Sequence, residues 1–276
     1  MPEMFYMQTQ GALLPHKIIE NDRAFPIRYC PRAVVKRIAA VKQEERNMEA
    51  VNALKLLLTF DPYVYNIIGV SLRVSGIALL FSTLIGIPVG TILGLTHFRG
   101  KPFVTALLYT GMGFPPVVIG LFVFLLFSSV GPMGSLGWLF TTKAMITAQT
   151  IIAFPLVSGF TMAAVLSVDK NLMKQLQALG ATKLQASWAA IKEARIGVLV
   201  AIIAGFGGII SEVGAVMLVG GNIEGKTRVL TTAIVLETRQ GNFGVAIAFG
   251  IILLSITFIA NLTMVTLQKR HLFASE

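Results

Sequence analysis

The chain has 276 residues, of which 55% are hydrophobic and only 13% are charged, and its mean hydropathy is +0.76. A soluble domain has about 25% charged residues, so this composition excludes an ordinary soluble protein and indicates membrane-spanning helices. The net charge of +10 does not indicate nucleic-acid binding, because the basic residues cluster in short links between apolar runs, and the single cysteine, Cys30, excludes a disulfide framework and a cysteine-based metal site.

Residues 1–47 are polar and irregular, without an apolar stretch that could be a signal sequence. They carry eight Lys or Arg against five Asp or Glu, and in the topology derived below they would have to cross the membrane, against the rule that basic segments stay inside. The codons of Gln43-Glu44-Glu45 can read as an AGGAGG-like purine run a few bases before the Met48 codon. We therefore expect residues 1–47 to be a translated leader before the true start at Met48, with a disordered extension as the alternative. Residues 48–276 are then one transmembrane domain.

Five apolar segments follow, and each exceeds the roughly 20 residues that cross ~30 Å of hydrocarbon. The first opens with Asp61-Pro62, a carboxylate cap followed by a proline in the first turn. Prolines inside the first and third segments imply kinks that neighbouring helices can absorb. The predicted spans are residues 66–95, 103–127, 140–166, 196–219 and 243–267.

The links between the spans predict the orientation. The first link, the link 167–195 and the C-terminal tail carry most of the basic side chains between and after the spans, so we place them in the cytoplasm. The uncharged link 128–139 and the link 220–242, where charges roughly balance, are expected outside. The first span therefore begins outside the cell membrane, and the C-terminus lies in the cytoplasm.

The cytoplasmic link 167–195 has the pattern of two short amphipathic helices that meet at Gly180. Thr182 and Gln185 form a capping-box pattern at the start of the second helix. Such a link can present an apolar ridge to a partner, although its faces could instead pack on the protein's own helices. The apolar residues with helical spacing are Leu172, Leu176 and Leu179 in the first helix, and Leu184, Trp188 and Ile191 in the second.

The run Ala178-Leu179-Gly180-Ala181-Thr182, followed by Trp188, resembles the cytoplasmic loop signature of permease subunits of type I ABC importers. The sequence departs from that signature where Lys174-Gln175-Leu176 replaces Glu-Ala-Ala and where Lys192 replaces a proline. The resemblance implies docking to a separate ABC ATPase. The residues expected at this contact are Leu176, Ala178, Leu179, Gly180, Ala181, Thr182, Leu184 and Trp188.

A second resemblance covers the chain from Met48 to its end. Residues 210–223 look like the fourth-span signature of molybdate and tungstate permeases, and residues 228–243, 114–121 and 131–134 are similar to the tungstate branch. The resemblance implies an all-α integral membrane protein with the type I ABC importer permease fold and five transmembrane helices per subunit. It also implies a homodimeric pore in membrane lipid, an ATPase subunit that uses ATP and Mg, and an extracytoplasmic oxyanion-binding protein. The expected cargo is tungstate, with molybdate or sulfate as alternatives, and the chain itself is expected to bind no cofactor.

Polar side chains inside membrane spans are candidates for the translocation path. Arg73 and Glu212 lie at matching depths, roughly 10 Å from the outer ends of their spans, and we predict that they form an ion pair. In the alternative, Arg73 extends to the interface and Glu212 bonds to neighbouring backbone. Gln149, Thr150 and Ser211 could hydrogen-bond a passing anion or hold helices together.

The segment Gly220–Thr227 matches the phosphate-loop pattern G-x4-G-K-[ST], which would make the chain a membrane nucleotide hydrolase. We reject this interpretation, because the segment joins two predicted spans outside the membrane and lacks a strand–loop–helix context. A channel or structural subunit that needs no ATPase is a third possibility. The sequence contains no His–carboxylate cluster that suggests a catalytic or metal site, so ATP hydrolysis is expected on another subunit.

Overall fold

The computed structural model describes residues 62–273, and these residues form helices joined by short links. Residues 1–47 and the predicted start at Met48 lie outside the described residues. In chain order the helices are α2 (Pro62–Leu95), α3 (Lys101–Met112), α4 (Pro116–Phe127), the 3-10 turn η1 (Gly134–Leu136), α5 (Thr142–Leu166), α6 (Lys170–Ala178), α7 (Lys183–Glu193), α8 (Arg195–Ile210), α9 (Gly214–Gly220), α10 (Leu230–Gln240) and α11 (Phe243–Phe273).

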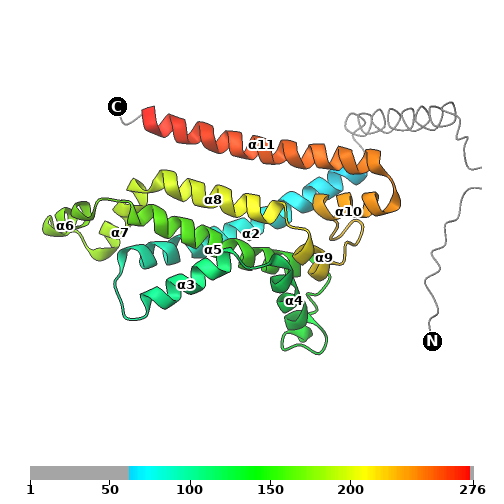
Figure 1. Ribbon diagram of the computed structural model, residues 1–276, viewed down its shortest axis with the longest axis horizontal. Coiled ribbons are helices and arrows are strands. Elements are labelled where there is room, and N and C mark those ends of the chain that lie inside the picture. Colours follow the sequence, from blue (N-terminus) through cyan, green and yellow to red (C-terminus); the bar gives the residue numbers. More distant parts are fainter. Residues whose placement is uncertain (1–61, 274–276) are drawn as a thin grey trace, which may run out of the picture. The chain divides into compact units, whose positions relative to one another are not determined.

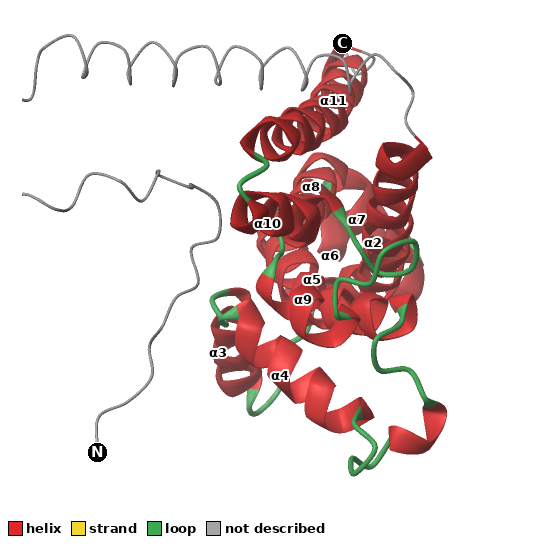
Figure 2. Cartoon of the chain, turned by 90° about the vertical axis from the view of Figure 1, so that its right-hand side faces the viewer, coloured by secondary structure: helices red, strands yellow, loops and turns green. Residues whose placement is uncertain are grey.

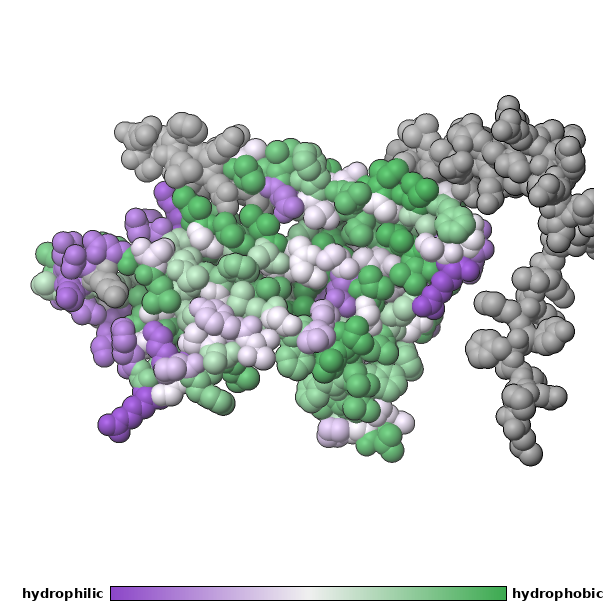
Figure 3. All heavy atoms as spheres, in the orientation of Figure 1, coloured by the Kyte–Doolittle hydropathy of each residue, from purple (hydrophilic) through white to green (hydrophobic). Residues whose placement is uncertain are grey.

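The centre of the fold is a bundle in which α2, α5 and α8 pack along one another. The helices α6 and α7 lie at one end of this bundle, and α10 lies at the opposite end (Figure 1). Polar residues gather at both ends, and an apolar band lies between them (Figure 3). This distribution is the one that a bilayer imposes on a spanning protein.

The most extensive contact in the bundle is between α2 and α5, where glycines of α2 let the two backbones approach. A Cβ added to Gly86 would lie 3.0 Å from the Val157 side chain, and one added to Gly90 would collide with the carbonyl oxygen of Ser158. The hydroxyl of Ser82 also donates to the Thr150 carbonyl at 3.1 Å. Small residues that permit close approach are a usual means of joining helices in membranes.

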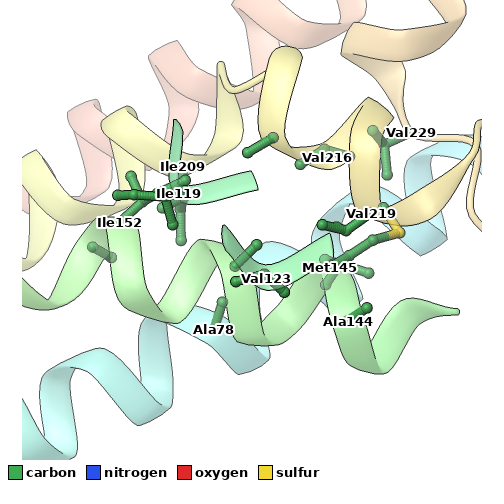
Figure 4. Packing of buried hydrophobic residues seen from close by; sticks show 14 of the residues in the cluster. Ala78, Ile119, Val123, Ala144, Met145, Ile152, Ile209, Val216, Val219 and Val229 are labelled. Atoms are coloured by element: carbon green, nitrogen blue, oxygen red, sulfur yellow. The ribbon is translucent and has the colours of Figure 1, made fainter. Parts of the chain in front are cut away.

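A buried apolar cluster lies where α2, α4, α5, α8 and α9 meet (Figure 4). Met145 and Val123 are fully buried in it, and Ile209 from the end of α8 is buried beside them. Residues far apart in the sequence therefore form one core, and that core holds the ends of α8, α9 and α4 together.

The second predicted span, 103–127, is not one straight helix. It consists of α3 and α4, which meet at an angle of 98°. The bend follows Gly113 and contains Pro115 and Pro116. Proline has no N–H to donate and keeps the preceding residue out of the helical conformation, so the chain cannot continue through this point as a helix.

The fourth predicted span, 196–219, is also interrupted. Helix α8 ends at Ile210, and α9 begins at Gly214 after a break at 211–213. The Ser211 hydroxyl donates to the Gly207 carbonyl at 2.7 Å, and such a bond to a carbonyl four residues earlier often bends a helix. At its other end α8 meets α7 at 71°.

Three helices, within α2, α5 and α11, are long and apolar enough to cross a bilayer unbroken. The described residues therefore hold up to five spans if each of the two bent pairs, α3 with α4 and α7 with α8, counts as one. The sequence did not predict α10, which lies in the link 220–242 and packs against the start of α11 (Figure 2).

The α2–α5 contact predicts opposite changes of the thermal midpoint when two glycines of α2 are replaced by alanine. We expect Gly90→Ala to lower the thermal midpoint of the purified protein by roughly 5 °C, because overpacking costs about 1–3 kcal/mol. Gly76→Ala, where an added Cβ meets no atom within 4 Å, should raise the midpoint, because alanine favours a helix over glycine. Equal midpoints for the two variants would contradict the proposed contact.

Candidate functional site

The end of the bundle where α6 and α7 lie carries a helix–turn–helix, residues 167–195, that we call the handle. Its first helix, α6, is capped by Asp169, whose carboxylate accepts from the Asn171 N–H at 2.9 Å. It ends in a Schellman-type turn in which the Ala181 N–H donates to the Leu176 carbonyl at 2.9 Å and the Gly180 N–H donates to the Gln177 carbonyl at 3.0 Å. The turn needs a positive φ, which is +87° at Gly180, so a glycine is favoured there.

The second helix of the handle, α7, begins with the predicted capping box. The Gln185 N–H donates to Thr182 Oγ1 at 3.3 Å, and the Thr182 N–H donates to Gln185 Oε1 at 2.8 Å. Two otherwise unpaired backbone donors are thereby satisfied. The start of α7 is thus set by local sequence, as the spacing of Thr182 and Gln185 predicted.

The two faces of α7 differ strongly in exposure. Ala186 and Ala190 are fully buried. The opposite face is open, because Leu184 is 81% exposed and Trp188 is 69% exposed, and Leu179 from the turn is 84% exposed. Of the other predicted contact residues, Leu176 and Ala181 are half-buried, whereas Ala178, Gly180 and Thr182 are exposed. A leucine, leucine and tryptophan ridge therefore projects from a polar surface.

Two of the predicted path residues lie on α5 and differ in what their side chains bond to. Gln149 is only 3% exposed, and its Nε2 donates to the Ile209 carbonyl of α8 at 3.0 Å, so it joins two helices. The Thr150 hydroxyl donates to the Ile146 carbonyl of its own helix at 2.7 Å and joins no second helix.

The predicted ion pair between Arg73 and Glu212 is not formed. Arg73 is exposed on α2, whereas one carboxylate oxygen of Glu212 accepts from the Ala215 N–H at 2.9 Å. The structure has an ion pair elsewhere, between Arg228 and Glu224, whose charged groups are 3.0 Å apart. Glu212 is neutralised in part by the start of α9, because a carboxylate is stabilised by free N–H groups at a helix N-terminus.

The phosphate-loop lookalike forms a closed turn. Gly220 ends α9, and the Thr227 hydroxyl, whose residue is 1% exposed, donates to the Gly220 carbonyl at 2.6 Å and accepts from the Ile223 N–H at 2.9 Å. A phosphate loop needs this hydroxyl for a metal ion and a helix that starts directly at the lysine. Here the hydroxyl is bonded within the turn and α10 begins only at Leu230, so the turn does not have the form of a nucleotide-binding loop.

A polar network at the end of the bundle that carries α10 was not found from the sequence. Arg228 donates to the Tyr63 hydroxyl at 2.8 Å and to Glu224, and its guanidinium lies 5.8 Å from the centre of the Tyr63 ring. The largely buried Glu237 accepts from Asn242 Nδ2 at 2.9 Å. The network ties the link 220–242 to the starts of α2 and α11. Its members are up to 174 residues apart, so local spacing could not reveal it.

The described residues contain no group of three or more His, Cys, Asp or Glu side chains that could hold a metal ion. The features that remain are therefore an apolar bundle, a polar handle and an interrupted fourth span. Together they define a helical integral membrane protein with a polar helix–turn–helix at one end of its bundle.

Comparison with known proteins places this class in a family. The family described as "Binding-protein-dependent transport system inner membrane component" matches this chain over residues 86–272. The chain is 43% identical over 204 residues to the "Probable anion ABC transporter permease protein" of Haloferax volcanii, which covers 72% of this chain and 88% of that protein. It is 40% identical over 221 residues to a tungstate uptake system permease protein of Peptoclostridium acidaminophilum, covering 79% of this chain and 95% of that protein. The chain belongs to the family of ABC transporter permeases.

Solved structures agree on the fold. A chain of a bacterial alginate ABC transporter, in complex with its periplasmic protein, aligns with a TM-score of 0.67 at 18% identity and covers 87% of this chain and 94% of that chain. A chain of the MetNI methionine transporter, in an inward-facing conformation, aligns with a TM-score of 0.60 at 16% identity and covers 75% and 95%. The predicted type I importer fold, the membrane location and the role as a permease with a separate ATPase are therefore confirmed.

The capping box gives a prediction for the handle. Thr182→Ala removes a cap worth about 1 kcal/mol, so amide exchange of residues 183–186 should accelerate about fivefold in the purified protein. Ser187→Ala is the control, because its hydroxyl bonds only to the Lys183 carbonyl within α7. Equal exchange rates in the two variants would show that the cap does not hold the start of α7.

The closed turn gives a second prediction. We expect Lys226→Ala to leave ATP hydrolysis by the assembled transporter unchanged within about twofold, because Lys226 is exposed and binds no nucleotide. Steady-state phosphate release measures this rate. A loss of hydrolysis in Lys226→Ala would instead support the rejected nucleotide-hydrolase interpretation.

Proposed function

We propose that this chain is the translocation subunit of an ATP-driven importer for a tetrahedral oxyanion, and that its cargo is tungstate. Relatives with high coverage support this cargo: the tungstate uptake permeases of Peptoclostridium acidaminophilum and Campylobacter jejuni are 40% and 36% identical to this chain. A molybdenum transport permease of Escherichia coli is only 29% identical over 64% of this chain. Molybdate is therefore the main competitor.

The ATPase subunit binds the handle in this proposal. The observation that carries it is the exposed ridge of Leu179, Leu184 and Trp188, which lies on an otherwise polar end of the bundle. Large exposed apolar side chains rimmed by polar residues are typical of protein contacts, and tryptophan is the residue type most often central to them. Gly180 sets the angle between α6 and α7 and so shapes the ridge.

The remaining partners follow from this assignment. Two copies of the chain form the pore, and an extracytoplasmic binding protein delivers the oxyanion to the end that carries α10. The handle and the C-terminus face the cytoplasm, and α2 begins outside. ATP and Mg are bound by the ATPase, and this chain needs no cofactor of its own.

The anion passes the interrupted fourth span in this proposal. Ser211 is exposed there, and Glu212 is half-buried beside it. Arg73 offers a positive charge on the exposed face of α2. Gln149 supports the path by bonding α5 to the end of α8, and Thr150 lies next to it on α5. A bare carboxylate would repel a dianion, but the Ala215 N–H partly offsets the charge of Glu212.

The cargo is tested by uptake into proteoliposomes that contain the chain, its ATPase and its binding protein. We expect ATP-dependent accumulation of tungstate that a tenfold excess of sulfate does not suppress. A preference for molybdate or sulfate would correct the cargo but not the class. Uptake without ATP would contradict the importer assignment and support a channel.

The handle is tested by the affinity of the permease for its ATPase. Trp188→Ala should weaken the complex by about 30-fold, since truncating a central aromatic typically costs 2 kcal/mol or more. Trp188→Phe should retain most of the affinity, because it keeps a large apolar ring. Wild-type affinity in Trp188→Ala would show that the ridge is not the ATPase contact.

A further inference from the structure

The break between α8 and α9 is held by side chains from two other helices. Gln149 of α5 donates to the Ile209 carbonyl at 3.0 Å, and the Thr231 hydroxyl of α10 donates to the Glu212 carbonyl at 2.9 Å. Both side chains are buried. Inside a membrane the backbone groups freed by a break need such partners, so these two bonds stabilise an interruption that would otherwise be costly.

A third bond makes α10 part of a fixed outer frame. Ser71 of α2 is 4% exposed, and its hydroxyl oxygen accepts from the Leu230 N–H at the start of α10 at 2.8 Å. The break is therefore bonded on one side to α5 and on the other, through Thr231, to a helix that is anchored on α2.

The helices on the two sides of the break both contact α5, but α8 also packs on α2, whereas α9 also packs on α4. Helix α8 packs along α5, where a Cβ added to Gly205 would lie 2.8 Å from Val157. Helix α9 packs closely on α4, where a Cβ added to Gly120 would lie 2.5 Å from the Cα of Ala215. Contacts this close resist sliding, so a relative motion of the two sides has to be taken up at the break.

The handle is directly continuous with α8. The Ala194 N–H donates to the Ala190 carbonyl at 2.9 Å, and the Val198 N–H donates to the Ala194 carbonyl at 3.0 Å, so two hydrogen bonds that meet at Ala194 connect α7 to α8 across the bend. A displacement of α7 by a partner is therefore passed to α8 and on to its end at Ile210.

One polar atom at the break has no partner in this arrangement. Gln149 Oε1 is buried and accepts no hydrogen bond within the part of the chain that the structure describes. A buried acceptor without a partner is unfavourable and uncommon, and it marks the break as a strained position.

We propose that residues 211–213 form a pivot of the transport cycle, and that Gln149 and Thr231 are positioning residues that couple the handle to the outer half of the permease. The inference rests on the proposed function. Movement of α7 and α8 changes the geometry at the break, and Thr231 transmits the change to α10. Neither residue needs to touch the transported anion.

The pivot is tested by amide hydrogen exchange on the unmodified transporter, compared between the nucleotide-free and the ATP-trapped state. We expect exchange of residues 211–215 to differ by about fivefold or more between the two states, since about 1 kcal/mol of changed protection gives that factor. Residues 150–158 of α5 serve as the internal reference and should not change. Identical exchange at 211–215 in both states would overturn the proposal.

The positioning residues are tested by the number of anions transported per ATP hydrolysed. Gln149→Leu and Thr231→Val remove one hydrogen bond each and should lower this ratio by about fivefold, while the ATPase still binds. Thr147→Val on α5 and Thr238→Val on α10 are matched controls, because their hydroxyls bond only within their own helices. An unchanged ratio in Gln149→Leu and Thr231→Val would overturn the coupling role.

The outcomes separate the pivot from the proposed function. If the wild-type chain fails to bind an ATPase or to import an oxyanion, the function itself is wrong. If it does both and the exchange at 211–215 does not respond to ATP, only the pivot is wrong. If a variant does not assemble, the exchange measurement on the unmodified protein decides the question.

Discussion

In hydrocarbon a backbone N–H or C=O without a partner is far more costly than in water, and the architecture of this bundle follows from that constraint. Long helices meet it by themselves, as α2 and α5 do. The two interrupted spans meet it in different ways. At the bend between α3 and α4 the two prolines have no N–H to satisfy. At the break after α8, in contrast, backbone carbonyls accept hydrogen bonds from Gln149 and Thr231 on other helices.

The break restricts the sequence as well as costing free energy, because it requires polar residues at particular buried positions of α5 and α10. A transport subunit gains from such a feature. A rigid helix would move as one body from the handle to the outer surface, but an interrupted helix can pass on part of a motion and change its own geometry. Along the described chain, the break between α8 and α9 lies between the handle and the link 220–242.

The close contact of α2 with α5 fixes the frame in which this occurs. Glycines of α2 allow backbone approach, and the resulting pair presents one surface to α8 and another to α4. The handle, in contrast, depends on local bonds: a Schellman-type turn at Gly180 and a capping box at Thr182. Local bonds let it keep its shape while its apolar ridge remains free for another subunit.

The family resemblance was visible in short motifs, and the comparisons bear it out. The spacing of Thr182 and Gln185 and the position of Gly180 also predicted the handle correctly, because caps and turns are determined by neighbouring residues. The ion pair between Arg73 and Glu212 was wrong, because equal depth in two spans does not say which way each side chain points.

By itself the sequence determined the apolar composition, the approximate spans and the local form of the handle, since these depend on hydropathy and on residues within a few positions of one another. Only the tertiary structure decided where the fourth span breaks, which side chains hold that break, and how Tyr63, Arg228 and Glu237 meet at the outer end. Those contacts join residues from 19 to 174 positions apart, and no periodicity along one chain encodes which distant helix will lie beside another.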